Sequence, residues 1–141
     1  MPKPILSDSL FNATDVAEAI VDTIDLGVVN SNLAVVDRSS LFVLNSSYSH
    51  SVVQAYSFNG FMFVQLNCDK TTTANHLDVV YTISDSDFYP ISLFTTPSSG
   101  YQGDSVASLR FETNGEIRLD TPTNTGHSNF YINATGFYRF S

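Results

Sequence analysis

The sequence predicts a mainly β fold, an antiparallel β-sandwich or a jelly-roll-like barrel, with one short N-terminal helix. Short apolar runs recur roughly every ten residues between polar turn clusters, a spacing typical of sandwiches and barrels. Two Asn-Gly pairs mark hairpin turns, and one segment near the N-terminus has helical periodicity. The expected strands are Leu33–Val36, Leu41–Leu44, Val52–Phe58, Phe61–Leu66, Leu77–Ile83, Tyr89–Phe94, Val106–Phe111, Ile117–Leu119, Phe130–Ile132 and Phe137–Phe140.

The helix is expected over Ala13–Leu26, within an N-terminal segment of residues 1–27 that precedes a β head domain of residues 28–141. Asn12 can cap its start, acidic residues occupy its first turn, and Gly27 follows its end. Because so short a helix is marginal alone in water, its apolar stripe needs a partner surface. That surface is either the β domain or the same helix of neighbouring subunits. The stripe consists of Val16, Ile20 and Ile24.

The first Asn-Gly pair, Asn59-Gly60, fits a two-residue hairpin loop. The register then pairs Phe58 with Phe61 and Tyr56 with Phe63 on one face. It pairs Ala55 with Val64 and Val53 with Leu66 on the other, so both faces are mostly apolar. Since an antiparallel hairpin normally has one wet face, we expect one face on the core and the other against a second layer or another chain.

The second pair, Asn114-Gly115, fits a three-residue loop with Gly115 as a left-handed bulge residue. This register pairs Phe111 with Ile117 and Leu109 with Leu119, and keeps that face dry. The other face carries a set of charges in which opposite signs are expected to be diagonal neighbours. The set is Arg110, Glu112, Glu116 and Arg118. Aromatic residues continue almost to Ser141, so we expect the C-terminal strand to be built into the sheet.

The net charge of the chain argues against some classes of binding partner. The net charge is −8, and only 14% of residues are charged. A chain with this balance repels phosphate backbones and anionic lipid, so nucleic acid and membranes are not expected partners. No secretory signal or membrane span is visible in the sequence. The single cysteine, Cys68, excludes an internal disulfide and is expected to be a buried thiol.

Catalytic and metal-binding patterns are weak. His76 and Asp78 could lie on one side of a strand, but no Gly-x-Ser-x-Gly elbow supplies a nucleophile. Asp85 and Asp87 open like a calcium loop without its glycine and distal glutamate, so a solvated turn is favoured. His50 and the other histidines lack a second ligand at metal spacing. We expect no enzymatic activity and no cofactor.

Two polar loops offer the side chains that sugars need. The expected loop Thr95–Ser105 carries Tyr101, Gln102 and Asp104, and the loop Thr121–Asn129 carries His127 and Asn129. An aromatic ring stacks on the apolar face of a sugar, and planar amides or carboxylates bind adjacent hydroxyls. Long loops in compact β domains are often functional. These five residues are therefore the candidate saccharide site.

The whole pattern resembles the head modules of bacteriophage receptor-binding, baseplate and tail-fibre proteins. The resemblance is carried by the short helical segment, the head rich in Ser, Thr, Asn and aromatics, and the hairpins over residues 111–119 and 129–138. It implies a non-enzymatic virion protein, a homotrimer that binds a host-surface saccharide and contacts other virion proteins. The alternative is a purely structural capsid or tail component whose partner is another virion protein.

Overall fold

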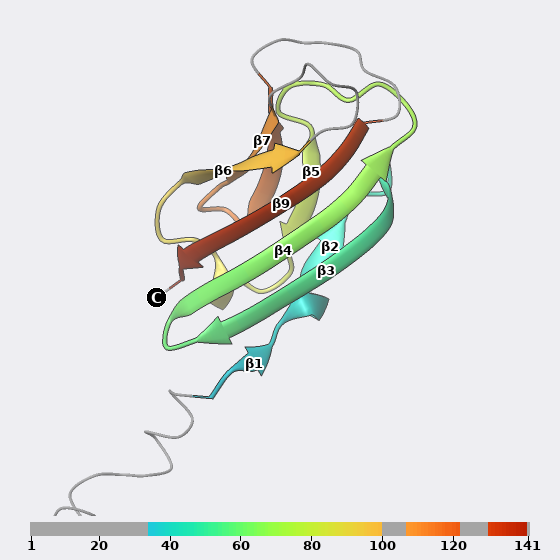
Figure 1. Ribbon diagram of the computed structural model, residues 1–141. Coiled ribbons are helices and arrows are strands. Elements are labelled where there is room, and N and C mark those ends of the chain that lie inside the picture. Colours follow the sequence, from blue (N-terminus) through green and yellow to red (C-terminus); the bar gives the residue numbers. More distant parts are fainter. Residues whose placement is uncertain (1–33, 100–106, 122–129, 141) are drawn as a thin grey trace, which may run out of the picture. The chain divides into compact units, whose positions relative to one another are not determined.

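The computed structural model describes residues 34–99, 107–121 and 130–140. The predicted helix Ala13–Leu26 and the boundary between residues 27 and 28 lie outside these ranges. The described residues form β-strands joined by turns and two short 3₁₀ helices (Figure 1). The elements are β1 Val36–Asp37, η1 Ser39–Leu41, β2 Phe42–Leu44, β3 Ser49–Phe58, β4 Phe61–Lys70, β5 Val79–Ile83, η2 Ser86–Phe88, β6 Phe94–Ser99, β7 Ala107–Phe111, β8 Glu116–Asp120 and β9 Phe130–Arg139.

The strands form one antiparallel sheet in the order β1-β3-β4-β9-β6-β7-β8-β5-β2. The sheet curls, so that β3, β4 and β9 lie in front of β2, β5 and β7 (Figure 1). Tyr81 of β5 spans the interior: its hydroxyl lies 3.0 Å from Ser51 Oγ of β3 and donates to the Asn67 carbonyl of β4 at 2.9 Å. The mainly β, antiparallel prediction is confirmed. Among the described residues, the expected sandwich layers are two parts of one curled sheet.

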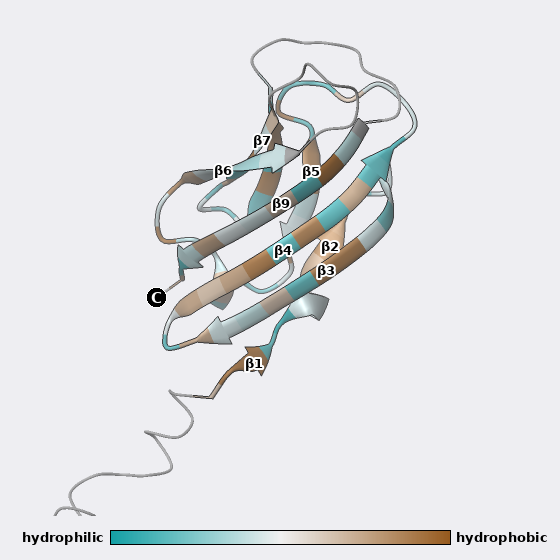
Figure 2. Cartoon of the chain, viewed as in Figure 1, coloured by the Kyte–Doolittle hydropathy of each residue, from teal (hydrophilic) through white to brown (hydrophobic). Residues whose placement is uncertain are grey.

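The core lies inside the curl. Along β4, alternate residues Met62, Val64, Leu66 and Cys68 point inward and are fully buried, as the two-residue period of a strand requires. Cys68 is thus a buried thiol, as predicted, and burial raises its pKa to about 12. Figure 2 shows that β4 is continuously apolar near its turn with β3 and that polar and apolar residues alternate only along its other half.

Both hairpin registers are confirmed. Across the Asn59-Gly60 turn, Phe58 pairs with Phe61 and Tyr56 pairs with Phe63, with positive φ at both turn residues. In the second hairpin, Phe111 pairs with Ile117 and Leu109 with Leu119, and all four side chains are fully buried. Gly115 has φ +84°. The C-terminal strand is also built into the sheet, because β9 pairs with β4 along its whole length.

The predicted strand Tyr89–Phe94 does not form. Instead, residues 84–93 make the turn η2 and an irregular segment that runs across the end of the core. Pro90 is buried there and has no N–H to donate to a sheet ladder. The Tyr138 hydroxyl donates to the Phe88 carbonyl at 3.0 Å. Phe88 and Tyr89 pack against the core, whereas Ile91 and Leu93 are exposed, so the apolar character of this run does not mark a strand.

The two predicted strands Phe130–Ile132 and Phe137–Phe140 are the ends of the single strand β9. Its middle lacks large apolar residues because Ala134 and Gly136 leave room for neighbouring rings. A Cβ at Gly136 would lie 3.4 Å from Phe94 and 3.5 Å from Phe111. Thr95 to Ser99 likewise belong to β6, so the predicted loop Thr95–Ser105 starts five residues too early.

Candidate functional site

The two predicted sugar-binding loops leave the sheet at the same end. Register pairs Ser98 at the end of β6 with Ala107 at the start of β7, and Ser108 with Asp120 at the end of β8. Ser99 pairs with Asn133 of β9. We call the end where β4, β6 and β8 finish and β7 and β9 begin the loop end. Residues 100–106 and 122–129 both connect strands there.

The five predicted site residues all lie in those two connections. They are Tyr101, Gln102, Asp104, His127 and Asn129, and they lie outside the described residues. The described residues do show where the two loops are attached. The four strands that the loops connect, β9, β6, β7 and β8, are consecutive in the sheet. Two segments separated in sequence by residues 107–121 are therefore tied to one end of the sheet.

The described part of the loop end carries three acid–base pairs. His50 Nδ1 lies 2.8 Å from Asp69 Oδ2, and Lys70 Nζ lies 2.7 Å from Asp78 Oδ2. His76 and Asp120 make the third pair, 3.5 Å apart between Nδ1 and Oδ1. A hydrogen bond donated by Ser49 Oγ, followed by one from His50, lowers the pKa of Asp69. The first two pairs lie beside the end of β4 and the third beside the end of β8.

Lys70 is the buried member of this group. It follows Cys68 in the inward period of β4, and its side chain is 8% exposed. Its ammonium lies 4.8 Å from the ring centroid of Tyr48, within the range of a cation–π contact. Burial opposes ionisation of Asp78, but hydrogen bonds from Lys70 and the Asn75 N–H, with the Lys70 charge, lower its pKa. The sequence analysis missed Lys70, although the alternation along β4 marks its position as inward.

His76 is not oriented by Asp78. Leu77 between them has φ +63°, so the segment is a turn and not a strand. His76 Nδ1 instead accepts a hydrogen bond from the Thr121 N–H at 3.3 Å, beside Asp120. This places the imidazole at the base of the connection that follows β8.

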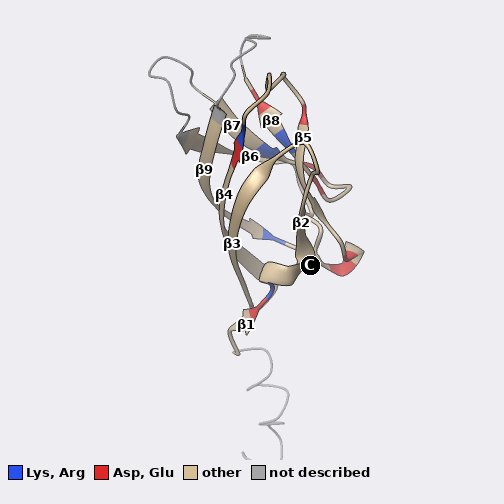
Figure 3. Cartoon of the chain, turned by 90° about the vertical axis from the view of Figure 1, so that its right-hand side faces the viewer, with Lys and Arg blue, Asp and Glu red and all other residues tan. Residues whose placement is uncertain are grey.

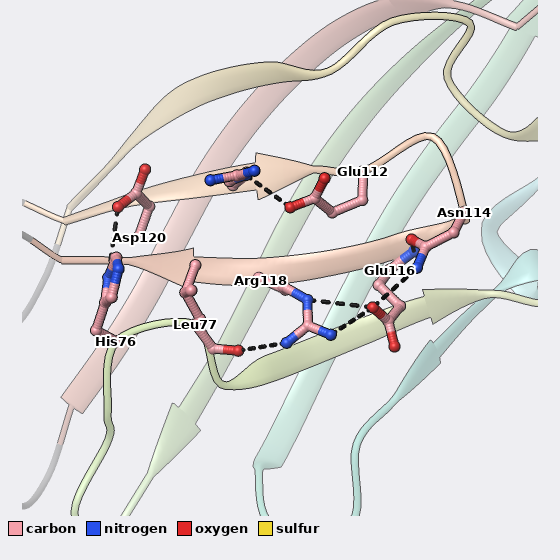
Figure 4. Close-up of polar contacts among 8 residues, drawn as sticks. His76, Leu77, Glu112, Asn114, Glu116, Arg118 and Asp120 are labelled. Atoms are coloured by element: carbon pink, nitrogen blue, oxygen red, sulfur yellow. Dashed lines mark hydrogen bonds and ion pairs between the residues drawn. The ribbon is translucent and has the colours of Figure 1, made fainter.

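The wet face of the β7–β8 hairpin holds that turn in place (Figure 4). Arg118 Nη1 donates to the Leu77 carbonyl at 2.8 Å, while its Nη2 contacts Glu116 Oε2 at 2.5 Å. Arg110 Nε lies 2.6 Å from Glu112 Oε1. The opposite charges therefore pair along each strand rather than diagonally, and the two arginines face each other across the ladder. Opposite charges are diagonal neighbours in this register, as expected. The ion pairs nevertheless form along each strand, because residues two apart share a side and are within reach.

Within the described ranges, no three His, Cys, Asp or Glu side chains are grouped so as to hold a metal ion. Asp85 accepts from the Asp87 N–H at 3.0 Å and caps η2, as the solvated-turn interpretation expects. No helix in the described part of the chain has the length and hydropathy to cross a membrane.

Comparison with solved structures identifies proteins of similar fold. The head domain of lactococcal phage bIL170, from work on a common fold of lactococcal phage receptor-binding domains, superposes with a TM-score of 0.57 at 18% identity, covering 77% of this chain and 99% of that one. The fold is that of a phage receptor-binding head. The receptor-binding protein of Listeria phage PSA superposes with a TM-score of 0.50 at 9% identity, over 89% of this chain and 77% of that chain. No family model and no curated protein matches by sequence.

The likeness to receptor-binding heads confirms the resemblance seen in the sequence. The superposition covers nearly the whole bIL170 head domain. At these identities the similarity defines the fold and transfers no individual binding residue.

Proposed function

We propose that this protein is the head of a phage adhesion protein that binds a host-surface saccharide through its loop end and acts as a homotrimer. The observation that carries the proposal is the receptor-binding-head fold, combined with two polar loops anchored on neighbouring strands at one end. The net charge of −8 favours a neutral or cationic receptor over nucleic acid or anionic lipid.

The chemistry of the site rests on five loop residues. Tyr101 supplies the ring that stacks on a sugar face, and the side chains of Gln102 and Asp104 bind neighbouring hydroxyls. His127 and Asn129 add donors and acceptors from the second loop. Such a site binds weakly alone, and linking three copies raises the avidity by orders of magnitude without new contacts.

The positions of β1 and the loop end, at opposite ends of the domain, fit this role. The chain enters through β1, which pairs with the end of β3 beside the Asn59-Gly60 turn. The loop end lies at the opposite end of β3. A connection to the rest of a virion at β1 therefore leaves the loops free to meet the cell surface.

A bacterial cell-wall and surface glycan array tests the proposal. We expect the wild-type chain to bind a defined set of glycans and Tyr101→Ala to lose that binding at least tenfold. Leu93→Ala is the matched control, because Leu93 is an exposed apolar residue beside the start of β6, away from the loops. If the wild type binds no glycan and copurifies tightly with another virion protein, the role is structural and the saccharide proposal is wrong.

A further inference from the structure

One face of the sheet carries aromatic side chains toward solvent. Tyr56, Phe63 and Phe137 stand directly opposite one another on β3, β4 and β9. Phe58 and Phe61 form the next pair, and the Phe61 ring stacks on Phe137 with centroids 5.2 Å apart. Exposed fractions are 39% for Tyr56, 42% for Phe58, 41% for Phe63 and 64% for Phe137. We call these five residues the aromatic face.

The core does not require this face. The inward residues of the same strands, such as Ala55, Val64 and Leu66, are already fully buried. By contrast, the outer face of the β7–β8 hairpin is polar and carries two arginines and two glutamates. Contiguous exposed aromatics are uncommon on a soluble monomer and mark an interaction surface.

The distribution of charged residues around the aromatic face indicates which kind of partner it can bind. β3 has no acidic or basic residue apart from His50, and its ribbon carries no charge colour in Figure 3. The five side chains of the aromatic face are uncharged, although the chain carries −8 overall. The register places Arg139 opposite Phe61 and Asp37 opposite Tyr56, so charges border this face. Two copies of so acidic a chain repel each other over most of their surface. An aromatic surface with Arg139 and Asp37, of opposite sign, at its edges is where they can meet at low electrostatic cost.

We propose that the aromatic face is the surface through which identical copies of this chain pack together. The three neighbouring ten-residue strands that carry the aromatic face span a plane of roughly 15 by 33 Å. The five aromatic residues occupy the half of this plane near the Asn59-Gly60 turn. Projecting side chains and the edge strand β1 add to the area of the plane, which then approaches the roughly 800 Å² that each partner buries in a stable interface. A glycan chain would leave much of such a surface exposed.

Packing between copies extends the proposed function and rests on it, because weak saccharide sites are what require linked copies. A rotation axis running from the Asn59-Gly60 turn toward the loop end would bury the aromatic faces of all copies at the centre. The same axis would direct every loop end to one side. The copies would then offer several receptor sites to one cell surface.

Light scattering on the full chain tests the packing surface. We expect the wild type at micromolar concentration to have a mass close to three times 15.5 kDa, and Phe63→Ser/Phe137→Ser to have the mass of one chain. Loss of two central aromatic anchors should raise the apparent Kd by more than about 100-fold. The control Ile91→Ser/Leu93→Ser removes apolar residues of similar exposure elsewhere and should leave the oligomer intact. A wild type that remains a single chain at 100 μM overturns the inference, as does a double Phe variant that stays oligomeric.

A fluorescence probe gives an answer independent of variant folding. The chain has no tryptophan, so Phe137→Trp places a single reporter on the aromatic face with little change in shape. We expect blue-shifted emission that moves to the red as the protein is diluted to the monomer. Ile91→Trp should emit as a solvated indole at every concentration. Red-shifted emission from Phe137→Trp in the oligomer would show that copies meet elsewhere.

The two proposals fail separately. An oligomer that dissociates on mutation of the aromatic face but binds no glycan retains this inference and removes the saccharide function. A wild-type monomer whose glycan binding is abolished by Phe63→Ser/Phe137→Ser, with Tyr101→Ala unaffected, makes the aromatic face a sugar platform. That result overturns packing between copies.

Discussion

Gly115 lies directly against the ring of Tyr89. A Cβ added at Gly115 would be 2.3 Å from Tyr89 Cε1, and the residue has φ +84°. The same glycine accepts a hydrogen bond from the Ile83 N–H at 2.8 Å. One residue thus ties the β7–β8 hairpin to β5 and to the segment that closes the core.

Gly115→Ala should therefore be strongly destabilising. The positive φ and the displaced Tyr89 ring together predict a loss of about 2–4 kcal/mol in the free energy of unfolding. Urea denaturation followed by circular dichroism measures it. Thr113→Ala, in the same loop but exposed, should change the stability by less than about 0.5 kcal/mol. Equal effects of the two substitutions would refute the steric explanation.

The buried Lys70–Asp78 pair predicts a second stability effect. Asp78→Asn leaves the Lys70 ammonium, with a side chain 8% exposed, without its carboxylate. Removing one partner of a buried pair is costly, and we expect a loss of about 2–4 kcal/mol. Asp69→Asn is the matched control, because its partner His50 is 79% exposed and the loss should stay below about 1 kcal/mol. Chemical denaturation of both variants distinguishes the pairs, and a control loss as large as that of Asp78→Asn would contradict the assignment.

Acid should destabilise the fold. The pKa values of Asp78, Asp69 and Glu116 are lowered in the folded protein, so folding favours their ionised forms. This contribution is fully present above the unfolded pKa, near 4, and is lost as pH falls through the lower folded values. The urea midpoint should be steady from pH 7 to pH 5 and fall below about pH 4. Asp78→Asn should show a smaller acid loss, whereas an unchanged wild-type midpoint at pH 3 would contradict the assignment.

Cys68 should report global unfolding. Its side chain is fully buried and burial raises its pKa to about 12, so little thiolate is available to react. We expect alkylation at pH 8 to be more than about 100-fold slower in the folded protein than in urea, because exposure requires opening of the core. Mass spectrometry of samples quenched over time measures the rate. Rapid labelling of the native protein would mean that β4 opens locally.

Local sequence was sufficient to predict both hairpins. Asn59-Gly60 and Asn114-Gly115 dictate turns by their tolerance of positive φ, and the apolar alternation on either side sets the register. The burial of Cys68 followed from the tendency of a free cysteine to behave as a small apolar residue. These features depend on neighbours in sequence, so the sequence contains what is needed to infer them.

Strand length and core closure were harder to predict. β9 runs through Asn133 and Thr135 because β4 pairs with it along its length and β6 pairs with it at Ser98 and Ser99. In the apolar run Tyr89–Phe94 only Phe94 enters the sheet, as the first residue of β6, while Tyr89 packs against the core. Hydropathy cannot distinguish these cases, because an apolar side chain is equally favourable in a strand and over the end of a core.

The sequence by itself determined the β class, the two hairpin registers and the presence of an apolar surface on each side of the β3–β4 pair. Only the tertiary structure decided which surface faces the core, because the direction in which a sheet curls depends on contacts between distant strands such as that of Tyr81 with Ser51 and Asn67. It also brought the anchors of two separate loops to one end, since strand order is set by long-range pairing.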